Sequence, residues 1–329
     1  MSSSLTVKFI DFWPAFDIYN NKFIDALRAK FQVISLEPDN PAKPDLLFYS
    51  RCGLGNHYKY NDCVKIFYTG ENDYPNFNEC DYSISFHDID VNGRNLRYPL
   101  YALETSTEAI PKIKPNKDMA SREFCSLVMS NSDMCDPRRI QIIEAVNNYR
   151  EIASGGKFRN NIGHRVDNKL EFLSKYKFNL ALENSYVDGY VTEKIADAFI
   201  SATVPIYWGG KSVLSDFNPA AFINAADYST LDSLVSEIKK IDSDPELYLS
   251  YLTAPSQLAD TIIDFDDRLS TFLTRIASNP KIHRTNYGEM GLFHNRYSIL
   301  HPLSHRRSFI FLSKLIGRII EPQYFKTYS

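Results

Sequence analysis

Residues 178–210 read FNLALENSYVDGYVTEKIADAFISATVPIYWGG, a run that predicts a strand, a polar loop, a helix and a second strand. The apolar residues 178–182 are typical of a buried strand, and residues 184–189 carry turn-forming side chains. One face of the helix is apolar, because four side chains recur at helical spacing: Ile195, Ala198, Phe199 and Ala202. Residues 204–208 form the next strand, which ends at two glycines. This order of elements indicates a parallel α/β layer.

Charged and hydroxyl side chains gather at the start of that helix. Thr192 is placed to cap it, and Glu193 and Lys194 follow in its first turn. Free backbone N–H groups and the helix dipole attract phosphate there, and Lys194 adds a full positive charge. The carboxylate of Glu193 would not bind phosphate, but it can accept hydrogen bonds from sugar hydroxyls. The pattern fits a nucleotide-sugar diphosphate site, although a capped surface helix with solvated side chains is the commoner origin of such a pattern.

The same region carries a family resemblance. Three segments resemble the donor-binding signature of the α1,3/4-fucosyltransferases, glycosyltransferase family 10: Glu183-Asn184, Gly189-Tyr190-Val191-Thr192-Glu193-Lys194 and Pro205-Ile206-Tyr207-Trp208-Gly209. Further segments are similar to bacterial members in the same order: Tyr68-Thr69-Gly70-Glu71-Asn72, Pro75-Asn76-Phe77, Val128-Met129-Ser130-Asn131, Ser154-Gly155-Gly156 and Arg159-Asn160. The resemblance is strong over roughly residues 64–225.

The rest of the chain repeats the alternation of strands and helices. We expect strands at residues 7–13, 32–36, 46–49, 64–68 and 82–86, and helices within 18–31, 140–149 and 228–252. Residues 110–122 contain two prolines and several lysines without apolar periodicity, so they read as a linker. The alternation predicts an α/β fold, and the resemblance implies the GT-B arrangement, two Rossmann-like domains facing across a cleft.

The expected domains follow from that linker. They are an acceptor-side domain at 1–117, a GDP-fucose-binding domain at 118–300 and a basic amphipathic tail at 301–329. The tail carries five basic residues against one acidic residue beside a broad apolar stripe. Such a helix can lie on an anionic membrane, and it can equally pack back on the first domain.

Composition narrows the class of protein. A chain of 329 residues with 44% hydrophobic residues suits two globular domains. The net charge of −3 without a basic stripe gives no case for nucleic-acid binding. Five cysteines without a C-x-x-C pair argue for reduced thiols, and the N-terminus has no apolar targeting segment. We therefore expect a cytoplasmic protein, with the tail as a peripheral contact to the inner face of a bacterial membrane.

The resemblance assigns the catalytic base. Inverting transfer needs a group that takes the proton of the acceptor hydroxyl. The Glu of the family's Gly-Glu-Asn turn is at Glu71, directly after the strand expected at 64–68. On pattern alone, Glu71 would be a solvent-facing turn residue.

The resemblance also assigns the donor-binding residues. Arg139 matches a phosphate-binding Arg, although the neighbouring Arg138 leaves the register uncertain by one. Lys194 would hold the other side of the diphosphate, and Glu193 would bind hydroxyls of fucose or ribose. Asn184 and Tyr190 match positions of the donor loop; Tyr190 could also pack on Trp208. Residues 157–160 are a weaker donor candidate, for which a solvated loop is an equal alternative.

No metal is expected to be essential, and no cofactor beyond the GDP-fucose substrate. Asp88 and Asp90 have the spacing of an Asp-x-Asp metal motif, but they read better as a polar strand end. The resemblance implies an inverting α1,3-fucosyltransferase that moves L-fucose from GDP-fucose to the GlcNAc of N-acetyllactosamine-type glycans, giving a Lewis X-type product on surface polysaccharide. The alternatives are a GT-B transferase with another nucleotide-sugar donor and a non-catalytic glycan-binding protein. The choice between the 3- and 4-hydroxyl and the oligomeric state are not readable.

Overall fold

The structure is a computed structural model that describes residues 3–53, 55–104, 110, 113–114, 117–130, 135–257 and 265–284. Within these residues the strands form two sheets. The first has the order β2-β1-β3-β4-β5-β6 and the second the order β11-β10-β9-β7-β8. The pairings β1–β2, β1–β3 and β3–β4 are parallel, as are β7–β9, β9–β10 and β10–β11. The predicted α/β fold of the GT-B class is therefore confirmed.

Packing divides the described residues into two units. One unit comprises the residues up to Tyr68, Pro75–Ser83 and the residues from Leu273 onward. The other comprises Thr69–Tyr74 and Ile84–Phe272. The short segment Thr69–Tyr74, which carries Glu71, thus packs with the second unit although its neighbours in the chain pack with the first. The predicted tail at 301–329, Asn131 and part of the predicted linker lie outside the described residues.

The first sheet is built from the five predicted strands and from β6, which was not predicted. Its elements are β1 (Ser4–Ile10), α1 (Lys22–Arg28), β2 (Gln32–Leu36), β3 (Leu46–Tyr49), β4 (Val64–Tyr68), β5 (Tyr82–Ser85) and β6 (Asn95–Arg97). Every residue of β3 and β4 is buried, as expected for central parallel strands that read as apolar runs. The first strand begins three residues earlier than predicted, where Ser4 pairs with Gln32 of β2, and it ends three residues earlier because Asp11 adopts a left-handed φ of 61°.

The second unit contains β7 (Glu123–Leu127) and α3 (Pro137–Tyr149). Its further elements are α2 (Leu100–Glu104), β8 (Ala153–Ser154), α4 (Lys169–Leu173), β9 (Tyr176–Leu182), α5 (Glu193–Ile200), β10 (Val204–Trp208), α6 (Val213–Asp216) and β11 (Ile223–Asn224). Helix α3 starts three residues before the predicted helix at 140–149. The reason is local: Asp136 accepts a hydrogen bond from the backbone N–H of Arg138, and Pro137 occupies the first helical position.

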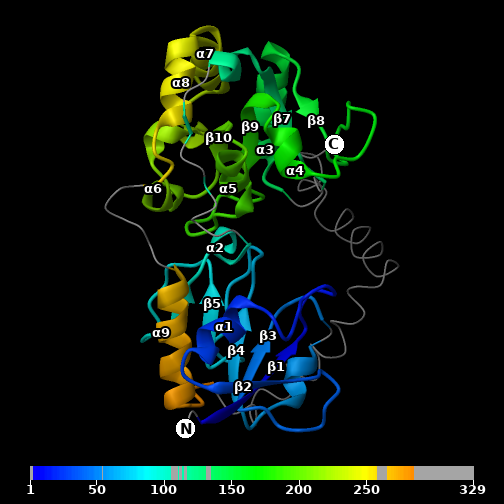
Figure 1. Cartoon of the computed structure of the whole chain (residues 1–329), viewed down its shortest axis with the longest axis vertical. Coiled ribbons are helices and arrows are strands. Elements are labelled where there is room, and N and C mark those ends of the chain that lie inside the picture. Colours follow the sequence, from blue (N-terminus) through cyan, green and yellow to red (C-terminus); the bar gives the residue numbers. More distant parts are fainter. Residues whose placement is uncertain are drawn as a thin grey trace, which may run out of the picture. The chain divides into compact units, whose positions relative to one another are not determined.

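The helix predicted at 228–252 is two helices, α7 (Leu231–Ser243) and α8 (Pro245–Thr253). Asp244 ends the first and caps the second, accepting from the N–H groups of Glu246 and Leu247. Because Pro245 has no N–H and fixes its own φ, it starts a helix more readily than it continues one. The two helices pack on each other within the second unit (Figure 1). A last helix, α9, covers Phe265–Ser278.

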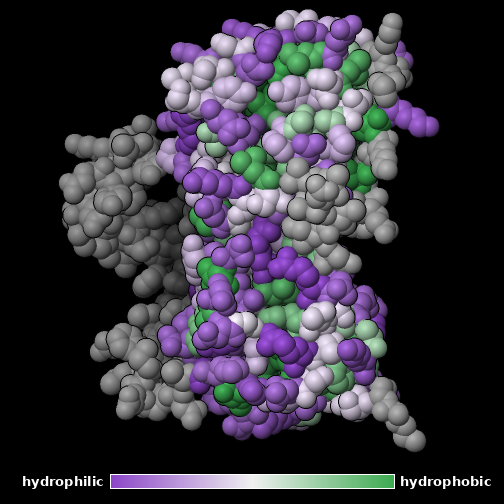
Figure 2. Space-filling view, turned by 90° about the vertical axis from the view of Figure 1, so that its left-hand side faces the viewer, coloured by the Kyte–Doolittle hydropathy of each residue, from purple (hydrophilic) through white to green (hydrophobic). Residues whose placement is uncertain are grey.

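Surface features complete the description. Figure 2 shows hydrophobic residues on one face as small patches between hydrophilic ones. In the described part of the chain, no helix combines the length and apolar character needed to cross a membrane.

Candidate active site

Helix α5 begins directly after a loop that returns from the end of β9. Its first residues contact Glu183, which follows β9 and has no exposed surface. The carboxylate of Glu183 accepts hydrogen bonds from the Thr192 backbone N–H at 2.7 Å and the Thr192 hydroxyl at 2.8 Å. Thr192 is the N-cap residue of α5, as predicted, but its hydroxyl makes no capping hydrogen bond. The Thr192 hydroxyl instead donates a hydrogen bond to the Glu183 carboxylate, because an ionised acceptor forms a stronger hydrogen bond than a neutral one.

Lys194 completes this arrangement. Its ammonium lies 3.0 Å from a Glu183 oxygen and 2.9 Å from the Thr192 hydroxyl. Burial alone would lower the pKa of Lys194, but Glu183 and Glu193 outweigh burial and raise it. An ammonium has three donors, so in the described part of the chain one remains for a ligand. The side chain is 20% exposed, enough for a ligand to reach it.

Glu193 lies beside this pair at the first position of α5. Burial would raise the pKa of its carboxyl, but Lys194 and Lys169 lower it below the usual value. Glu193 is therefore ionised at neutral pH and can accept hydrogen bonds from hydroxyl groups. That chemistry matches the predicted role toward sugar hydroxyls.

Arg139 reaches the same region from α3. Its side chain is only 4% exposed, and its Nη1 donates to Asn184 Oδ1 at 2.8 Å. Asn184 also accepts the Asp136 N–H through its backbone carbonyl, at 2.9 Å, so the loop after β9 is tied to the start of α3. Arg139 forms no ion pair with any described residue, and its buried Nε has no hydrogen-bond partner there. Burial lowers the pKa of Arg139, a sign that its charge is under-compensated.

Of the two arginines that the sequence left open, Arg139 is the one beside Asn184. Arg138 contributes its backbone N–H to the Asp136 cap. A buried, planar guanidinium with an unused donor suits an oxygen-rich anion such as phosphate.

Tyr190 is buried between these charged residues and Phe86. The two rings lie 4.9 Å apart, and burial raises the pKa of Tyr190, with further contributions from Glu183 and Glu71. The alternative that Tyr190 packs on Trp208 is wrong: the ring paired with Trp208 is Tyr186, at 5.8 Å. A phenol that stays protonated can donate a hydrogen bond to a ligand oxygen.

The turn before Tyr190 requires glycine. Gly189 has a left-handed φ of 91°, and a Cβ there would lie 2.2 Å from the Phe86 carbonyl oxygen. The Gly189 carbonyl is approached at 3.5 Å by Arg97, whose guanidinium forms a buried two-point ion pair with Asp216 at 2.7 and 2.9 Å. Sequence analysis missed this pair, because the partners are 119 positions apart and no local pattern links them.

Glu71 lies in the exposed turn that follows β4. Its N–H donates to the Thr69 hydroxyl at 3.1 Å, which shapes the turn. The segment is anchored by Tyr74, whose ring lies 3.7 Å from that of the buried His87. Since Glu71 is among the charges that raise the pKa of Tyr190, its carboxylate lies within electrostatic range of the donor-loop residues.

The weaker candidates have other contacts. Arg159 pairs with Glu144 at 2.7 Å, and Asn160 donates to the carbonyls of Gly156 and His164 within its own loop. Asp88 and Asp90 are exposed. Within the described residues, no three His, Cys, Asp or Glu side chains are grouped as a metal site.

Comparison with known proteins gives the family. Residues 7–104 match the α-(1,3)-fucosyltransferase FucT N-terminal domain, and residues 118–270 match the C-terminal domain of glycosyltransferase family 10 (fucosyltransferase). The two parallel-sheet units thus define a GT-B glycosyltransferase fold. The chain belongs to glycosyltransferase family 10, the fucosyltransferases.

Individual relatives agree with this assignment. The chain is 34% identical to the α-(1,3)-fucosyltransferase FucT of Helicobacter pylori over 309 residues, covering 82% of this chain and 64% of that protein. It thus spans less than two thirds of that relative's length. An α-(1,4)-fucosyltransferase of Arabidopsis thaliana is 30% identical over 146 residues, 38% of this chain and 36% of the relative. A crystal structure of an α1,3-fucosyltransferase with GDP-fucose superposes with a TM-score of 0.72 at 31% identity, covering 87% and 94% of the two chains.

Proposed function

We propose that this chain is an inverting α1,3-fucosyltransferase that moves L-fucose from GDP-fucose to the GlcNAc of an N-acetyllactosamine-type glycan. The observation that carries the proposal is the buried Arg139, which lacks a carboxylate partner among the described residues, next to the loop that leads to Lys194. Two such cations fit the two phosphates of a nucleoside diphosphate. The solved relatives that contain GDP-fucose and GDP support this choice of donor.

The proposed reaction forms one bond and breaks one. The acceptor hydroxyl oxygen attacks the anomeric carbon of fucose from the face opposite the diphosphate, and the bond from that carbon to the phosphate oxygen breaks. Glu71 takes the hydroxyl proton as general base. Arg139 and Lys194 stabilise the negative charge that develops on the departing GDP. Attack from the opposite face inverts the configuration at the anomeric carbon.

The other donor-loop residues bind the sugar and need no metal in this proposal. Glu193 accepts hydrogen bonds from fucose or ribose hydroxyls, and the protonated Tyr190 donates one. Asn184 orients Arg139 through their 2.8 Å hydrogen bond. The charge of the diphosphate is balanced by side chains and by the start of α5. A chelator should therefore leave the rate unchanged.

The cellular setting is proposed on the sequence alone. The first sheet would bind the acceptor glycan, and the product would be a Lewis X-type structure on surface polysaccharide. The basic stretch 301–329 would contact anionic lipid on the cytoplasmic side of the membrane.

The test measures GDP release on mixing protein, GDP-fucose and N-acetyllactosamine, with the product linkage read by NMR. We expect a product with fucose α-linked to the 3-hydroxyl, and a loss of rate of about 10²- to 10⁴-fold in Glu71→Ala with the Kd for GDP-fucose unchanged. Parallel assays with GDP-mannose and UDP-galactose test other donors. Transfer from one of these alone would contradict the fucose assignment, and full activity of Glu71→Ala would contradict the assigned base.

A further inference from the structure

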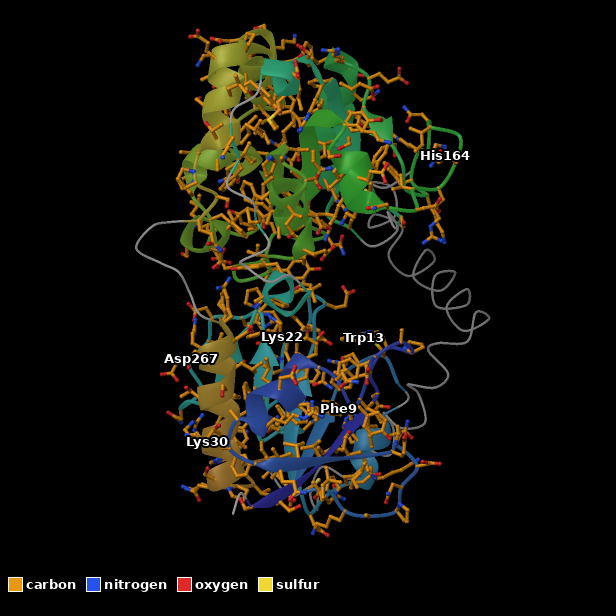
Figure 3. All side chains as sticks on the ribbon, in the orientation of Figure 1. Phe9, Trp13, Lys22, Lys30, His164 and Asp267 are labelled. Carbon is orange, nitrogen blue, oxygen red and sulfur yellow. The ribbon has the colours of Figure 1, made fainter. Side chains whose placement is uncertain are left out.

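The first unit contains a pocket of about 450 Å³ beyond the end of β1. Its wall is aromatic, with Phe12, Trp13 and Phe16 half-buried, and its rim is polar, with Asp39, Asn56 and Lys59. Figure 3 shows Phe9 on β1 and Trp13 beyond the end of that strand. None of these residues has a role in the donor site described above.

The aromatic wall is built on the core of the unit. The Phe12 ring lies 4.2 Å from Phe16 and 5.6 Å from the buried Phe9. Trp13 lies 5.0 Å from Phe16, edge to face. Because these rings support one another, their half-exposed faces stay in place without a ligand. A preformed apolar surface of this kind gains free energy when a ligand covers it.

The turn that presents this wall is fixed by a strained residue. Asp11 has a left-handed φ of 61°, which is costly for a residue other than glycine. Its buried carboxylate accepts from Asn56 Nδ2 at 3.0 Å and from the His57 N–H at 3.1 Å. Gly53 leaves room for it, since a Cβ there would lie 2.0 Å from Asp11 Oδ1. Such strain persists only where surrounding contacts impose it, and it is concentrated at functional sites.

The rim determines the class of ligand. Lys59 donates to Asn56 Oδ1 at 2.9 Å, and Asp39 offers an exposed carboxylate of opposite charge. With the buried Asp11 carboxylate also in the lining, the pocket has two carboxylates and one ammonium, so it does not attract a phosphate or another anion. Amide, carboxylate and ammonium groups do match the hydroxyls of a sugar, whose C–H face can lie on an indole or phenyl ring.

We infer that this pocket is a subsite for a neutral pyranose ring of the glycan acceptor, distinct from the ring that receives fucose. Trp13 and Phe12 bind the apolar face of the sugar, and Asp39 and Asn56 bind its hydroxyls. The inference rests on the proposed function for its link to the reaction.

Chain connectivity supports that link. Phe12 stacks nearly parallel to Tyr68, the last residue of β4, with ring centroids 6.1 Å apart. Glu71 follows Tyr68 by three positions, and three residues of chain span at most about 11 Å. The backbone at Glu71 therefore lies within about 11 Å of the backbone at Tyr68, the residue on which the aromatic wall packs.

The first experiment measures binding without any reaction. The chain has only two tryptophans, Trp13 and Trp208, so the difference in fluorescence between wild type and Trp13→Phe reports on Trp13. We expect neutral oligosaccharides of N-acetyllactosamine repeats to change that difference signal in a saturable way, more tightly for a tetrasaccharide than for a disaccharide. No change with any saccharide, or an equal change with GDP alone, would overturn the inference.

The second experiment measures turnover. Trp13→Ala should raise KM for a tetrasaccharide acceptor about fivefold and leave kcat and the KM for GDP-fucose within twofold, since one aromatic contact contributes about 1 kcal/mol. Trp13→Phe should restore most of the loss. Tyr19→Ala, which removes a 45% exposed ring of the same segment outside the pocket, is the matched control and should change nothing.

The outcomes separate this inference from the proposed function. If wild type transfers no fucose but the Trp13 fluorescence responds to saccharide, the proposed reaction fails and the pocket stands. If wild type is active and Trp13→Ala changes kcat and both KM values together, or none of them, Trp13 is not an acceptor contact and the inference fails. Thermal unfolding of each variant checks that the first unit remains folded.

Discussion

The pocket beyond β1 and the site at the start of α5 use opposite means to bind a ligand. The pocket is an aromatic wall with one cation and one anion on its rim. The α5 site gathers Arg139 and Lys194 near the buried Glu183. An anion needs charge that is already oriented, because reorienting dipoles during the reaction costs free energy. A neutral sugar needs a flat surface and a few hydrogen bonds. Under the proposed function, the donor and the acceptor would be bound by two sites that work by different physical means.

Among the changes to the charged site at the start of α5, replacement of Glu183 should lower the free energy of unfolding most. Glu183→Gln removes one partner of a buried ion pair and leaves the Lys194 charge uncompensated, so the free energy of unfolding should fall by about 3–5 kcal/mol. Adding Lys194→Met to that variant should recover part of the loss. Glu144→Gln breaks the half-exposed pair with Arg159 and should cost less than about 1 kcal/mol. Urea unfolding of the four proteins gives the comparison; equal losses in Glu183→Gln and Glu144→Gln would contradict it.

Acid titration tests the anchor of the Glu71 segment. Burial lowers the pKa of His87 from its usual 6.5 to about 4, and neither ring nitrogen has a partner among the described residues. The unfolded chain therefore binds a proton more readily, so the free energy of unfolding should decrease as the pH falls from 6.5 toward 4, by up to about 3 kcal/mol.

The matching variants isolate this effect. His87→Phe keeps a ring under Tyr74 and should flatten the pH dependence in that range. His164→Phe, at an exposed position, should leave it as in wild type. If the two variants show the same slope of unfolding free energy against pH, the assignment to His87 is incorrect.

Replacement of Arg139 tests whether the two binding devices are independent. Arg139→Met should weaken GDP binding about 10- to 100-fold, since a charge-assisted hydrogen bond contributes about 1.5–3 kcal/mol. The Trp13 fluorescence response to saccharide should be unchanged. Arg138→Met, whose position contributes a backbone N–H to the α3 cap, should bind GDP as wild type does. Calorimetry with GDP measures all three; weaker saccharide binding in Arg139→Met would show that the devices are coupled.

The sequence predicted the elements whose signals are local. The β9–α5–β10 unit followed from apolar runs and helical periodicity, and its observed bounds differ from prediction by at most two residues at the strand ends. The break between α7 and α8 was missed although Asp244 and Pro245 are local signals, because the apolar spacing continues across them. The end of β1 depends on Asp11, whose strained backbone is imposed by Asn56 and His57 and has no signature in the surrounding sequence.

The residues of the candidate site also divide into those that were identified from the sequence and those that were missed. The positions of Arg139, Asn184 and Lys194 were identified through the family resemblance, and the structure brings the first two into contact. The anchoring role of Glu183 and the Arg97–Asp216 pair were missed, because they depend on contacts between elements distant in the chain. Tyr186 and Tyr190 are both aromatic residues of one short loop, and the sequence pattern did not show that Tyr186 is the one paired with Trp208.

Thr69–Tyr74 packs with the second unit although the chain on either side of it packs with the first. This arrangement has a consequence for protein engineering. A hybrid enzyme that joins the N-terminal half of one family member to the C-terminal half of another would carry this segment from the first parent into a unit built by the second. In such a hybrid, Tyr74 and His87 would both come from the first parent and would stack on each other. Both would have to fit against the turn at Gly189, which would come from the second parent. Hybrids joined at the linker should lose activity even when both halves fold, unless the residues around Gly189 come from the same parent as Glu71.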